Sequence, residues 1–478
     1  MKKRNVWILS ALAALSAAPV VLAADQPAKN VILMISDGAG LQTWHAASYY
    51  RHGALGKEVY DDFDVKLFAS TYPLNTSTTP TKSNDGAVAF DAAQLWADKA
   101  SDAVFAGKLR PYEGYFQGYD YARADYTDSA AAATALASGH KTYNNAINWS
   151  NDDAPLKNIG EYVVESGRAL GVVSSVPWSH ATPAGFLAHN NNRNNYAEIG
   201  KEVVESGRAT VVMGSGHPLF DDDGVAREAK DDEAYQYVGG KETWEKLVSG
   251  QSQYHLIQSR EDFAALANNT LDFKGKEKIL GTAQTGRTLQ FNRKGQAGGA
   301  LLANQPDLAM MTQGALNVVS QNPQGFFLMV EGGAVDWAAH ANNLPRIIEE
   351  QIDFNLAVEA AVQWIENNSS WEDTLLIVTT DHGNGMLQGP DSDGKLYSPV
   401  LNQGAGALPL VRWHSDTHTR ELVPVYAKGK GAEYFPGVAK KEPALGKYYQ
   451  VPEESQQYVD NTDIFQAAAK AMGIDTSQ

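Results

Sequence analysis

Carboxylates and imidazoles occur in this sequence at spacings that suit a metal site. Asp336 and His340 are four residues apart, so one turn of a helix places both side chains on one face. Asp381 and His382 directly follow an apolar run, and His418 precedes another, "LVPVYA". Each pattern is common by itself, and a single histidine such as His418 is more often structural than a ligand. Together they predict a site of oxygen and nitrogen ligands that suits Zn²⁺ or Mg²⁺.

A second stretch that could take part in a reaction is the start of the alanine-rich segment "DSAAAATALASG" at residues 128–139. Its composition favours a helix that begins near Ser129. In one interpretation Ser129 and its neighbour Asp128 only cap the helix, because both residue types satisfy free backbone N–H groups there. In the other, Ser129 is a nucleophile placed where a helix N-terminus stabilises an anion. This stretch alone does not decide between them.

Three short apolar runs would position the acidic residues. They are "NVILMISDG", "FFLMVEGGAVDWAAH" and "TLLIVTTDHGNG", and they carry Asp37, Glu331 and Asp381 near their ends. Runs of this length and composition favour buried strands of a parallel sheet over helices. Helical patterns lie elsewhere, for example at residues 344–367 and 463–472. In open parallel sheets ligands bind beyond the carboxyl ends of the strands, where all three acidic residues fall.

The alternation of strands and helices predicts an α/β fold. We expect a doubly wound, mostly parallel central sheet with helices on both faces, in a single catalytic domain from residue 24 to residue 478. Two stretches of different composition, residues 71–121 and 220–300, are predicted to be surface insertions or a small subdomain. The sequence contains no internal repeat and no linker long enough to separate independent domains.

Composition and charge exclude several classes of protein. The chain has 478 residues, 43% of them hydrophobic and 20% charged, which is typical of a globular protein. A net charge of −17 makes general binding to nucleic acid unfavourable. Cysteine is absent, so disulfides and thiolate metal sites are excluded. Any metal site must therefore use His, Asp, Glu or hydroxyl ligands.

The first 23 residues have the pattern of an export signal. A basic start, "KKR", precedes an apolar segment over residues 7–22, and "VLA" at residues 21–23 offers a cleavage site. An uncleaved anchor is the less favoured interpretation, because a membrane span needs about 20 apolar residues. No later segment of the sequence is long and apolar enough to span a bilayer. We expect a periplasmic or secreted protein without stable membrane insertion.

Six motifs in order resemble those of the bacterial alkaline phosphatases. They are "SDGAG", "TDSAAAATALASGHKTYN", "HATPAGFLAHNNNR", "EGGAVDWAAH", "TTDHGNG" and "DTHTRELVP". The resemblance runs from about residue 30 to the C-terminus and covers the two predicted insertions poorly. It implies a doubly wound α/β sheet and a homodimer. It also implies two bound zinc ions and a third metal, usually magnesium.

The resemblance assigns metal ligands residue by residue. The first zinc would be held by Asp336, His340 and His418. The second would be held by Asp37, Asp381 and His382, with Ser129 on its phosphate side. The third metal would be held by Asp37, Thr182 and Glu331.

The resemblance also implies how a phosphate monoester would be hydrolysed. Ser129 would be the nucleophile and would become phosphorylated. Two metal ions can clamp the attacking and leaving oxygens of an in-line displacement. Arg193 would hold the phosphate, because its planar guanidinium matches two phosphate oxygens, and Asp128 would orient Arg193.

Two positions depart from the best-known enteric form of the family, which has an aspartate and a lysine there. This chain has His180 and Trp337, as other branches of the family do. The departure removes one positive charge near the substrate and leaves the identity of the third metal open.

Two other functions compete with phosphomonoester hydrolysis. A phosphodiesterase or sulfatase of the same superfamily would generally use Thr or a modified Cys or Ser as its nucleophile, whereas this chain has Ser129 together with Arg193. A non-catalytic protein that binds phosphate or zinc would not need an intact nucleophile. The sequence therefore favours a phosphomonoesterase.

Overall fold

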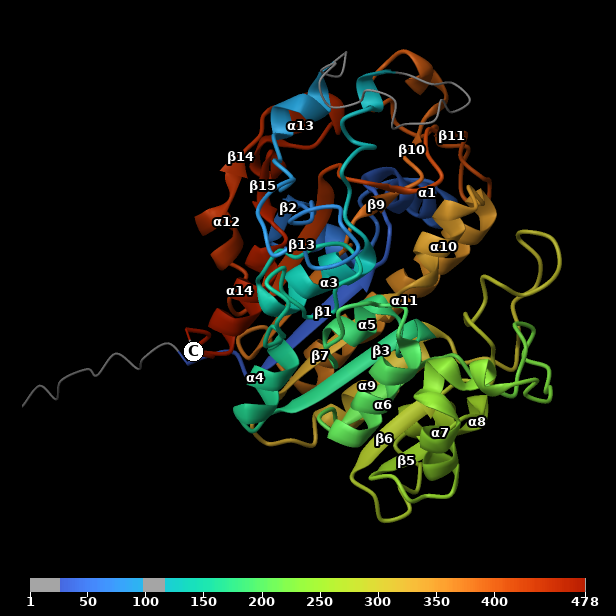
Figure 1. Cartoon of the computed structure of the whole chain (residues 1–478). Helices are drawn as coiled ribbons and strands as arrows, with labels where there is room; N and C mark the ends of the chain where they lie inside the picture. The colour runs from blue at the N-terminus through green and yellow to red at the C-terminus, as the bar shows by residue number, and fades with distance from the viewer. Residues whose placement is uncertain (1–25, 98–116, 478) are drawn as a thin grey trace, which may run out of the picture.

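A central sheet of eleven strands runs through the computed structural model, which describes residues 26–97 and 117–477 (Figure 1). The strand order is β14-β15-β2-β13-β8-β1-β7-β3-β4-β6-β5. The strands are β1 Asn30–Ser36, β2 Val65–Ser70, β3 Ala169–Pro177, β4 Val211–Ser215, β5 Tyr254–Ile257, β6 Lys278–Thr282, β7 Phe326–Gly332, β8 Thr374–Thr379, β13 Val423–Gly429, β14 Lys440–Lys441 and β15 Gln457–Asp460. Only β13 and β14 pair antiparallel with their neighbours, so the predicted mostly parallel sheet is confirmed.

Two short ribbons lie outside this sheet. In one, β9 (Gly383–Asn384) pairs antiparallel with β12 (His418–Thr419). In the other, β10 (Leu387–Gln388) pairs antiparallel with β11 (Arg412–Trp413). The first ribbon joins the segment after β8 to the segment before β13, and it holds His418 beside the end of β8.

The three strands predicted from apolar runs are neighbours in the middle of the sheet. β1 pairs with β8 on one side and with β7 on the other, and all three are buried along their whole length. In register, Ile35 of β1 lies opposite Glu331 of β7 and Thr379 of β8. The three strands therefore end at the same edge of the sheet, as predicted.

Helices cover both faces of the sheet. Alternate residues of β1 enter different cores: Val31 and Leu33 belong to the core that includes residues of α3, α4, α6, α7 and α14, whereas Ile32 and Met34 belong to the core that includes residues of α1, α8, α9, α10 and α11. The helices are α1 Leu41–His52, α3 Ser129–Ser138, α4 Ile159–Glu165, α5 Ala181–Gly185, α6 Tyr196–Ser206, α7 Gly240–Val248, α8 Arg260–Ala267, α9 Leu308–Val319, α10 Ala334–His340, α11 Leu344–Asn368, α12 Tyr434–Val438, α13 Ala444–Tyr448 and α14 Thr462–Ala471. The helices predicted at residues 344–367 and 463–472 are confirmed as α11 and α14 within one residue at each end.

Short 3₁₀ helices connect several of these elements. They are η1 Val59–Asp62, η2 Ala92–Trp96, η3 Gln117–Tyr119, η4 Asp232–Val238, η5 Pro390–Asp393 and η6 Glu453–Ser455. η2 and η3 belong to the stretch predicted as the first insertion, and their Trp96 and Tyr119 pack in a small separate core with Tyr397 and Tyr449. The second predicted insertion includes β5 and β6, which extend the central sheet in parallel beyond β4. This part of the second insertion is therefore built into the sheet.

Within residues 26–97 and 117–477, no helix combines the length and the apolar character that crossing a membrane requires. The predicted signal segment, residues 1–23, lies outside the described residues.

Candidate active site

The carboxyl ends of the central strands bring the predicted acidic residues together. Asp37 directly follows β1, Glu331 is the next-to-last residue of β7, and Asp381 follows β8 by two residues. Because these strands are in register, their ends converge on one place. All three carboxylates are buried, with at most 2% of each residue exposed.

At the start of α3, the two polar residues Asp128 and Ser129 have different roles. Asp128 is the N-cap: its Oδ1 accepts a hydrogen bond from the backbone N–H of Ala131 at 2.9 Å. Ser129 is therefore not needed as the cap, and its Oγ lies 3.1 Å from Nε2 of His382. The helix starts here because the cap, an uninterrupted alanine run and the left-handed Gly139 at its end all favour it.

Asp128 also holds Arg193. Its second oxygen, Oδ2, forms an ion pair with Nη1 of Arg193 at 3.0 Å. The backbone N–H of Arg193 donates to the carbonyl oxygen of Asn145 at 2.8 Å, which fixes the loop that carries it. Burial opposes the charge on Arg193, but Asp128, Tyr196 and Asp37 together outweigh it and raise the pKa of the guanidinium. Arg193 therefore stays charged beside the hydroxyl of Ser129.

A first group of ligand atoms consists of Asp336, His340 and His418. Nε2 of His340 lies 3.3 Å from Oδ2 of Asp336, and Nε2 of His418 lies 3.3 Å from Oδ1. Nδ1 of His340 is 2.7 Å from the carbonyl oxygen of Asp416, and Nδ1 of His418 is 2.9 Å from that of Thr127. If each Nδ1 carries the proton, both Nε2 atoms are free to bind a metal.

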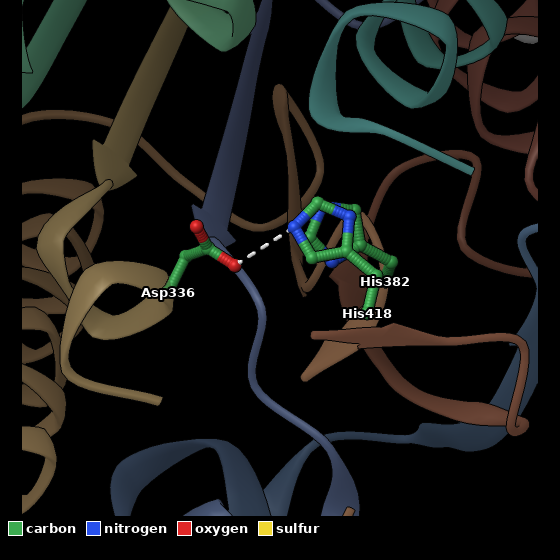
Figure 2. A group of neighbouring side chains, drawn as sticks. All are labelled: Asp336, His382 and His418. Atoms are coloured by element: carbon green, nitrogen blue, oxygen red, sulfur yellow. Dashed lines mark ion pairs between the residues drawn. The ribbon is translucent and has the colours of Figure 1, made fainter. Parts of the chain in front are cut away.

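A second group consists of Asp37, Asp381 and His382. Nε2 of His382 lies 3.1 Å from Oδ2 of Asp381 and 3.6 Å from Oδ1 of Asp37. Ligand atoms of these three residues lie within 4.8 Å of one another, and the same holds for Asp336, His382 and His418. His382 thus lies close to ligand atoms of both groups. Figure 2 shows its ring behind that of His418, with the two ring centroids 3.7 Å apart and Asp336 facing them.

Glu331 and Thr182 lie next to the second group. The hydroxyl of Thr182 donates to Oδ2 of Asp37 at 3.4 Å. Glu331 accepts a hydrogen bond from Ser174 of β3, which lies opposite it in the sheet. The arrangement agrees with the predicted third ligand set, Asp37, Thr182 and Glu331, although the roles of all these residues stay predictions.

The electrostatics of the two groups differ. Burial raises the pKa of Asp37 well above its usual range, with Asp381 adding to the effect. Burial also raises the pKa of Asp381 and of Glu331 to about 7. In the first group burial acts on Asp336 in the same direction, but His418 and His340 hold its pKa well below the usual range.

These observations test whether a metal fits. Oδ1 of Asp37, Oδ2 of Asp381 and Oε1 of Glu331 are buried oxygens without a hydrogen-bond partner. Buried carboxylates normally have partners or bind a cation. Carboxylates with imidazoles and no thiolate form a donor set that suits zinc, and carboxylates with a hydroxyl suit magnesium. The residues therefore fit bound divalent cations.

The two departures from the enteric pattern contact each other. The ring centroids of His180 and Trp337 are 5.5 Å apart, and His180 also stacks on Tyr196 at 5.7 Å. Burial, assisted by Arg193, lowers the pKa of His180 to about 3, so this imidazole is neutral at physiological pH.

A cavity of about 690 Å³ opens over the site. It is lined by predicted residues: Asp128, Ser129, His180, Arg193, Asp336, Trp337, His340 and His418. Trp337 therefore lies at the site, as expected from its place beside Asp336. Tyr126, Phe291, Ala341 and Thr417 also line the cavity and were not predicted.

Sequence reasoning also missed two supporting polar residues. Asn384 donates from Nδ2 to Oδ1 of Asp336 at 2.6 Å, and Ser174 donates to Glu331. Asn384 falls in the quoted motif "TTDHGNG", so its polar type beside Asp381 and His382 was an available signal. No comparable signal marks Ser174, which lies inside a buried strand.

The amino-acid sequence matches those of known proteins. The alkaline phosphatase family model matches residues 108–406. The chain is 31% identical to alkaline phosphatase H of Pseudomonas aeruginosa, over 86% of this chain and 82% of that protein. It is 26% identical to the alkaline phosphatase of Escherichia coli K12, over 94% and 87%. It is 29% identical to alkaline phosphatase 4 of Bacillus subtilis, over 65% and 73%.

Solved structures agree on the fold. The alkaline phosphatase of the Antarctic bacterium TAB5 matches with a TM-score of 0.59 at 23% identity, over 94% of this chain and 99% of that one. The cold-active alkaline phosphatase of a Shewanella species matches with a TM-score of 0.61 at 22% identity, over 93% and 99%. With the family model covering more than half of its length and relatives aligned along most of it, the chain belongs to the alkaline phosphatase family of hydrolases.

Proposed function

We propose that this alkaline phosphatase is an exported, metal-dependent phosphomonoesterase that acts through a phosphoserine at Ser129. One observation carries the proposal. The Ser129 hydroxyl stands at the first residue of α3, where Asp128 supplies the cap; Ser129 lines one cavity with Arg193 and the first ligand group, and its Oγ lies 3.1 Å from Nε2 of His382 in the second group. That combination offers a nucleophile, an anion-binding cation and metal ligands around one cavity.

The metal ligands divide into three sets. We propose one zinc ion at Asp336, His340 and His418, and a second at Asp37, Asp381 and His382. We propose one magnesium ion at Asp37, Thr182 and Glu331. When bound, these cations would neutralise charge on the phosphate and on the attacking and leaving oxygens.

The chain's own residues position the substrate. Arg193 presents two N–H groups to two phosphate oxygens, and Asp128 keeps its guanidinium in place at 3.0 Å. The N-terminus of α3 adds free backbone N–H groups that favour an anion beside Ser129. Burial of Ser129, which is 2% exposed, excludes bulk water from the attacking oxygen.

The reaction proceeds in two displacements. Oγ of Ser129 forms a bond to phosphorus while the bond from phosphorus to the ester oxygen breaks, and the alcohol leaves after taking up a proton. Water then attacks the phosphoserine, which releases inorganic phosphate and restores the hydroxyl. The serine proton lost in the first displacement is replaced in the second, so the enzyme is unchanged.

The nucleophile is tested by Ser129→Ala. We expect the metal-loaded variant to fold normally, to lose phosphoserine formation and to lose about a thousandfold or more in turnover of p-nitrophenyl phosphate. Acid quenching with ³²P-labelled substrate, followed by peptide mapping, locates the phosphorylated residue. Near-normal turnover, or a labelled peptide without residue 129, would refute the assignment.

Export is proposed from the sequence of residues 1–23. Expression of the full chain in a Gram-negative host should give a mature protein that begins at about residue 24 and is released with the periplasmic fraction. N-terminal sequencing of the fractionated protein checks both points. An uncut chain in the membrane fraction would favour the anchor interpretation.

A homodimer is proposed from the family resemblance. Leu401, Leu408 and Leu410 are each more than 40% exposed, and the segment that carries them contacts the end of α1 through the amide of Asn402 and the carbonyl of Gly53. An apolar surface of this kind is suited to burial between subunits. Light scattering of the purified protein determines the mass of the particle in solution.

A further inference from the structure

A second cavity, of about 790 Å³, lies away from the metal ligands. It is formed by the segment before α9, the first turn of α9 and one side of α11. Apolar side chains, among them Leu302, Ile352 and Leu356, supply part of its wall. Nothing in the proposed hydrolysis uses this cavity.

Five carboxylates line the cavity, and two of them are compensated by arginines. Glu349 pairs with Arg293 at 2.8 Å and with Arg346 at 3.3 Å. Glu359 pairs with Arg51 at 2.7 Å. The remaining set consists of Asp307, which caps α9 through the N–H of Met310, and of Glu350 and Asp353.

Glu350 and Asp353 have no ion pair with any of the described residues. Glu350 is 4% exposed, and its Oε1 has no hydrogen-bond partner. Asp353 accepts only a long contact, 3.3 Å, from the N–H of Leu308. Burial, with repulsion from neighbouring carboxylates, raises the pKa of Glu350 to about 8 and that of Asp353 to about 7.

A third acceptor points to the same missing partner. Gln305 lines the cavity and is 3% exposed, and its Oε1 has no partner either, although its Nε2 donates to the carbonyl of Gln284 at 2.9 Å. An amide oxygen accepts hydrogen bonds and cannot donate them. Gln305 therefore requires a hydrogen-bond donor, and the carboxylates of Glu350 and Asp353 favour a donor that also carries positive charge.

The wall of the cavity distinguishes an organic cation from a metal ion. Among the described residues, the only groups of three acidic or histidine side chains close enough to bind a metal are those at the candidate active site. Glu350 and Asp353 thus lack the third acidic or histidine ligand that such a metal site would need, whereas their oxygens can accept hydrogen bonds from the N–H donors of an ammonium group. Leu302, Ile352 and Leu356 suit an attached apolar chain.

The cavity is connected to the candidate active site through two consecutive residues. Gln290 lines this cavity and Phe291 lines the other. The backbone of Phe291 also hydrogen-bonds to the carboxylate of Glu350. A charge bound at Glu350 would therefore act directly on the residue that shapes the mouth of the candidate active site.

We propose that this cavity binds an amphipathic organic ammonium ion at Glu350, Asp353 and Gln305, and that its occupancy alters substrate binding through Phe291. The binding goes beyond the proposed function and does not depend on it. The effect on substrate rests on the proposed phosphatase activity.

Binding is tested by calorimetry on the full-length, metal-loaded protein, with inorganic phosphate present to occupy the candidate active site. The probe is hexylammonium chloride, and 1-hexanol serves as the uncharged control of the same length. We expect one site per chain and binding at least about tenfold tighter than that of hexanol. Equal binding of hexanol, or no binding of hexylammonium at about 10 mM, would overturn the proposal.

Variants locate the site. Glu350→Gln combined with Asp353→Asn should weaken hexylammonium binding at least about tenfold. The matched control is Glu359→Gln, which removes another carboxylate of the same cavity but one that Arg51 already neutralises, and it should bind as the wild type does. Unchanged binding by the double variant, or an equal loss in the control, would show that the two carboxylates do not form the site.

The kinetic effect is measured with p-nitrophenyl phosphate. Hexylammonium should change the KM of the wild type and of Glu359→Gln, and should leave the KM of the double variant unaltered. Binding without any change in KM would refute the coupling through Phe291. Because binding is read by heat and not by turnover, failure of this inference is distinguishable from failure of the proposed phosphatase.

Discussion

The two groups of ligand atoms are built from similar residues, yet they differ in their charge balance. In the first group two imidazoles face one carboxylate, and the pKa of Asp336 lies below its usual range. In the second group two buried carboxylates face one imidazole, and the pKa values of Asp37 and Asp381 are raised. The first group is therefore nearly balanced without a metal, whereas the second depends on a cation for its stability.

Exposure follows the same division. The side chain of His340 is 40% exposed and lies at the rim of the cavity, whereas Asp381 and His382 are fully buried behind Ser129. A balanced group with one exposed member, His340, can exchange a metal with little change elsewhere. An unbalanced, buried group couples its metal to the folding of the sheet edge.

The largest effect is expected from Asp381→Asn, which removes one ligand of the second group. We predict a loss of about a thousandfold or more in kcat/KM, because several kcal/mol of charge stabilisation would be lost beside the nucleophile. The metal-free variant should nevertheless be more stable than the metal-free wild type, because a buried carboxylate with a raised pKa has been neutralised. Activity assays and chemical denaturation with and without chelator measure both quantities.

These two changes have opposite signs, which makes the prediction specific to the charge imbalance. If Asp381 were only a structural residue, its substitution would lower activity and metal-free stability together. That result would contradict the proposed difference in charge balance between the two groups of ligand atoms.

A smaller effect is expected from His340→Ala in the first group. We predict zinc binding weaker by about tenfold to a hundredfold, with activity largely recovered when excess zinc is added. Recovery is expected because His340 is the exposed member of the group and the two buried members, Asp336 and His418, remain in place. Zinc titration of chelator-treated protein measures the shift, and an irreversible loss would contradict the assignment.

The charge imbalance also predicts a pH dependence of metal-free stability. Asp381 and Glu331 have a folded-state pKa of about 7, above their ordinary values of 3.8 and 4.5. Between those values the folded protein holds protons that the unfolded chain has released, so the free energy of unfolding falls as pH rises from about 4 to about 7. Bound metal should remove this decline.

Denaturant midpoints at about pH 5 and about pH 8, with chelator or with zinc and magnesium, test this dependence. Asp381→Asn is the control, because it should flatten the decline in the chelator-treated protein. A metal-free protein that gains stability over this range would contradict the predicted imbalance.

The smallest effect is expected from changes at His180 and Trp337, the two residues that depart from the enteric pattern. We predict that Trp337→Lys combined with His180→Asp tightens inhibition by inorganic phosphate about tenfold, or about 1 kcal/mol, because a cation is added near the phosphate. Slower release of phosphate would lower turnover wherever release limits the rate. Inhibition constants at two ionic strengths check the electrostatic origin, and weaker binding in a folded, zinc-loaded variant would rule it out.

The sequence predicted the parts of the site that follow directly from chain-local patterns. The strands that carry Glu331 or end just before Asp37 and Asp381 were predictable because short, mostly apolar runs mark buried parallel strands. Asp336 and His340 share a helical turn, and α10 confirms that spacing. Family motifs then supplied the roles that no local pattern contains.

What escaped prediction depends on contacts between distant parts of the chain. Ser174 and Glu331 are 157 positions apart and meet only because β3 pairs with β7. Phe291 reaches the cavity from a stretch that was predicted to be a surface insertion. β5 and β6 were missed in the same stretch. Half of the residues of β5 are only partly buried, so its apolar pattern is weak.

The two hydrogen-bonding oxygens of Asp128 restrict which amino acids this position can tolerate. Asparagine or serine could cap α3 but would carry no charge for Arg193, and glutamate would carry the charge on a side chain one methylene too long for the cap. Aspartate alone satisfies both partners at once. A substitution at position 128 would thus disturb two partners at once. The start of α3 and the loop that carries Arg193 are tied to each other through this one side chain.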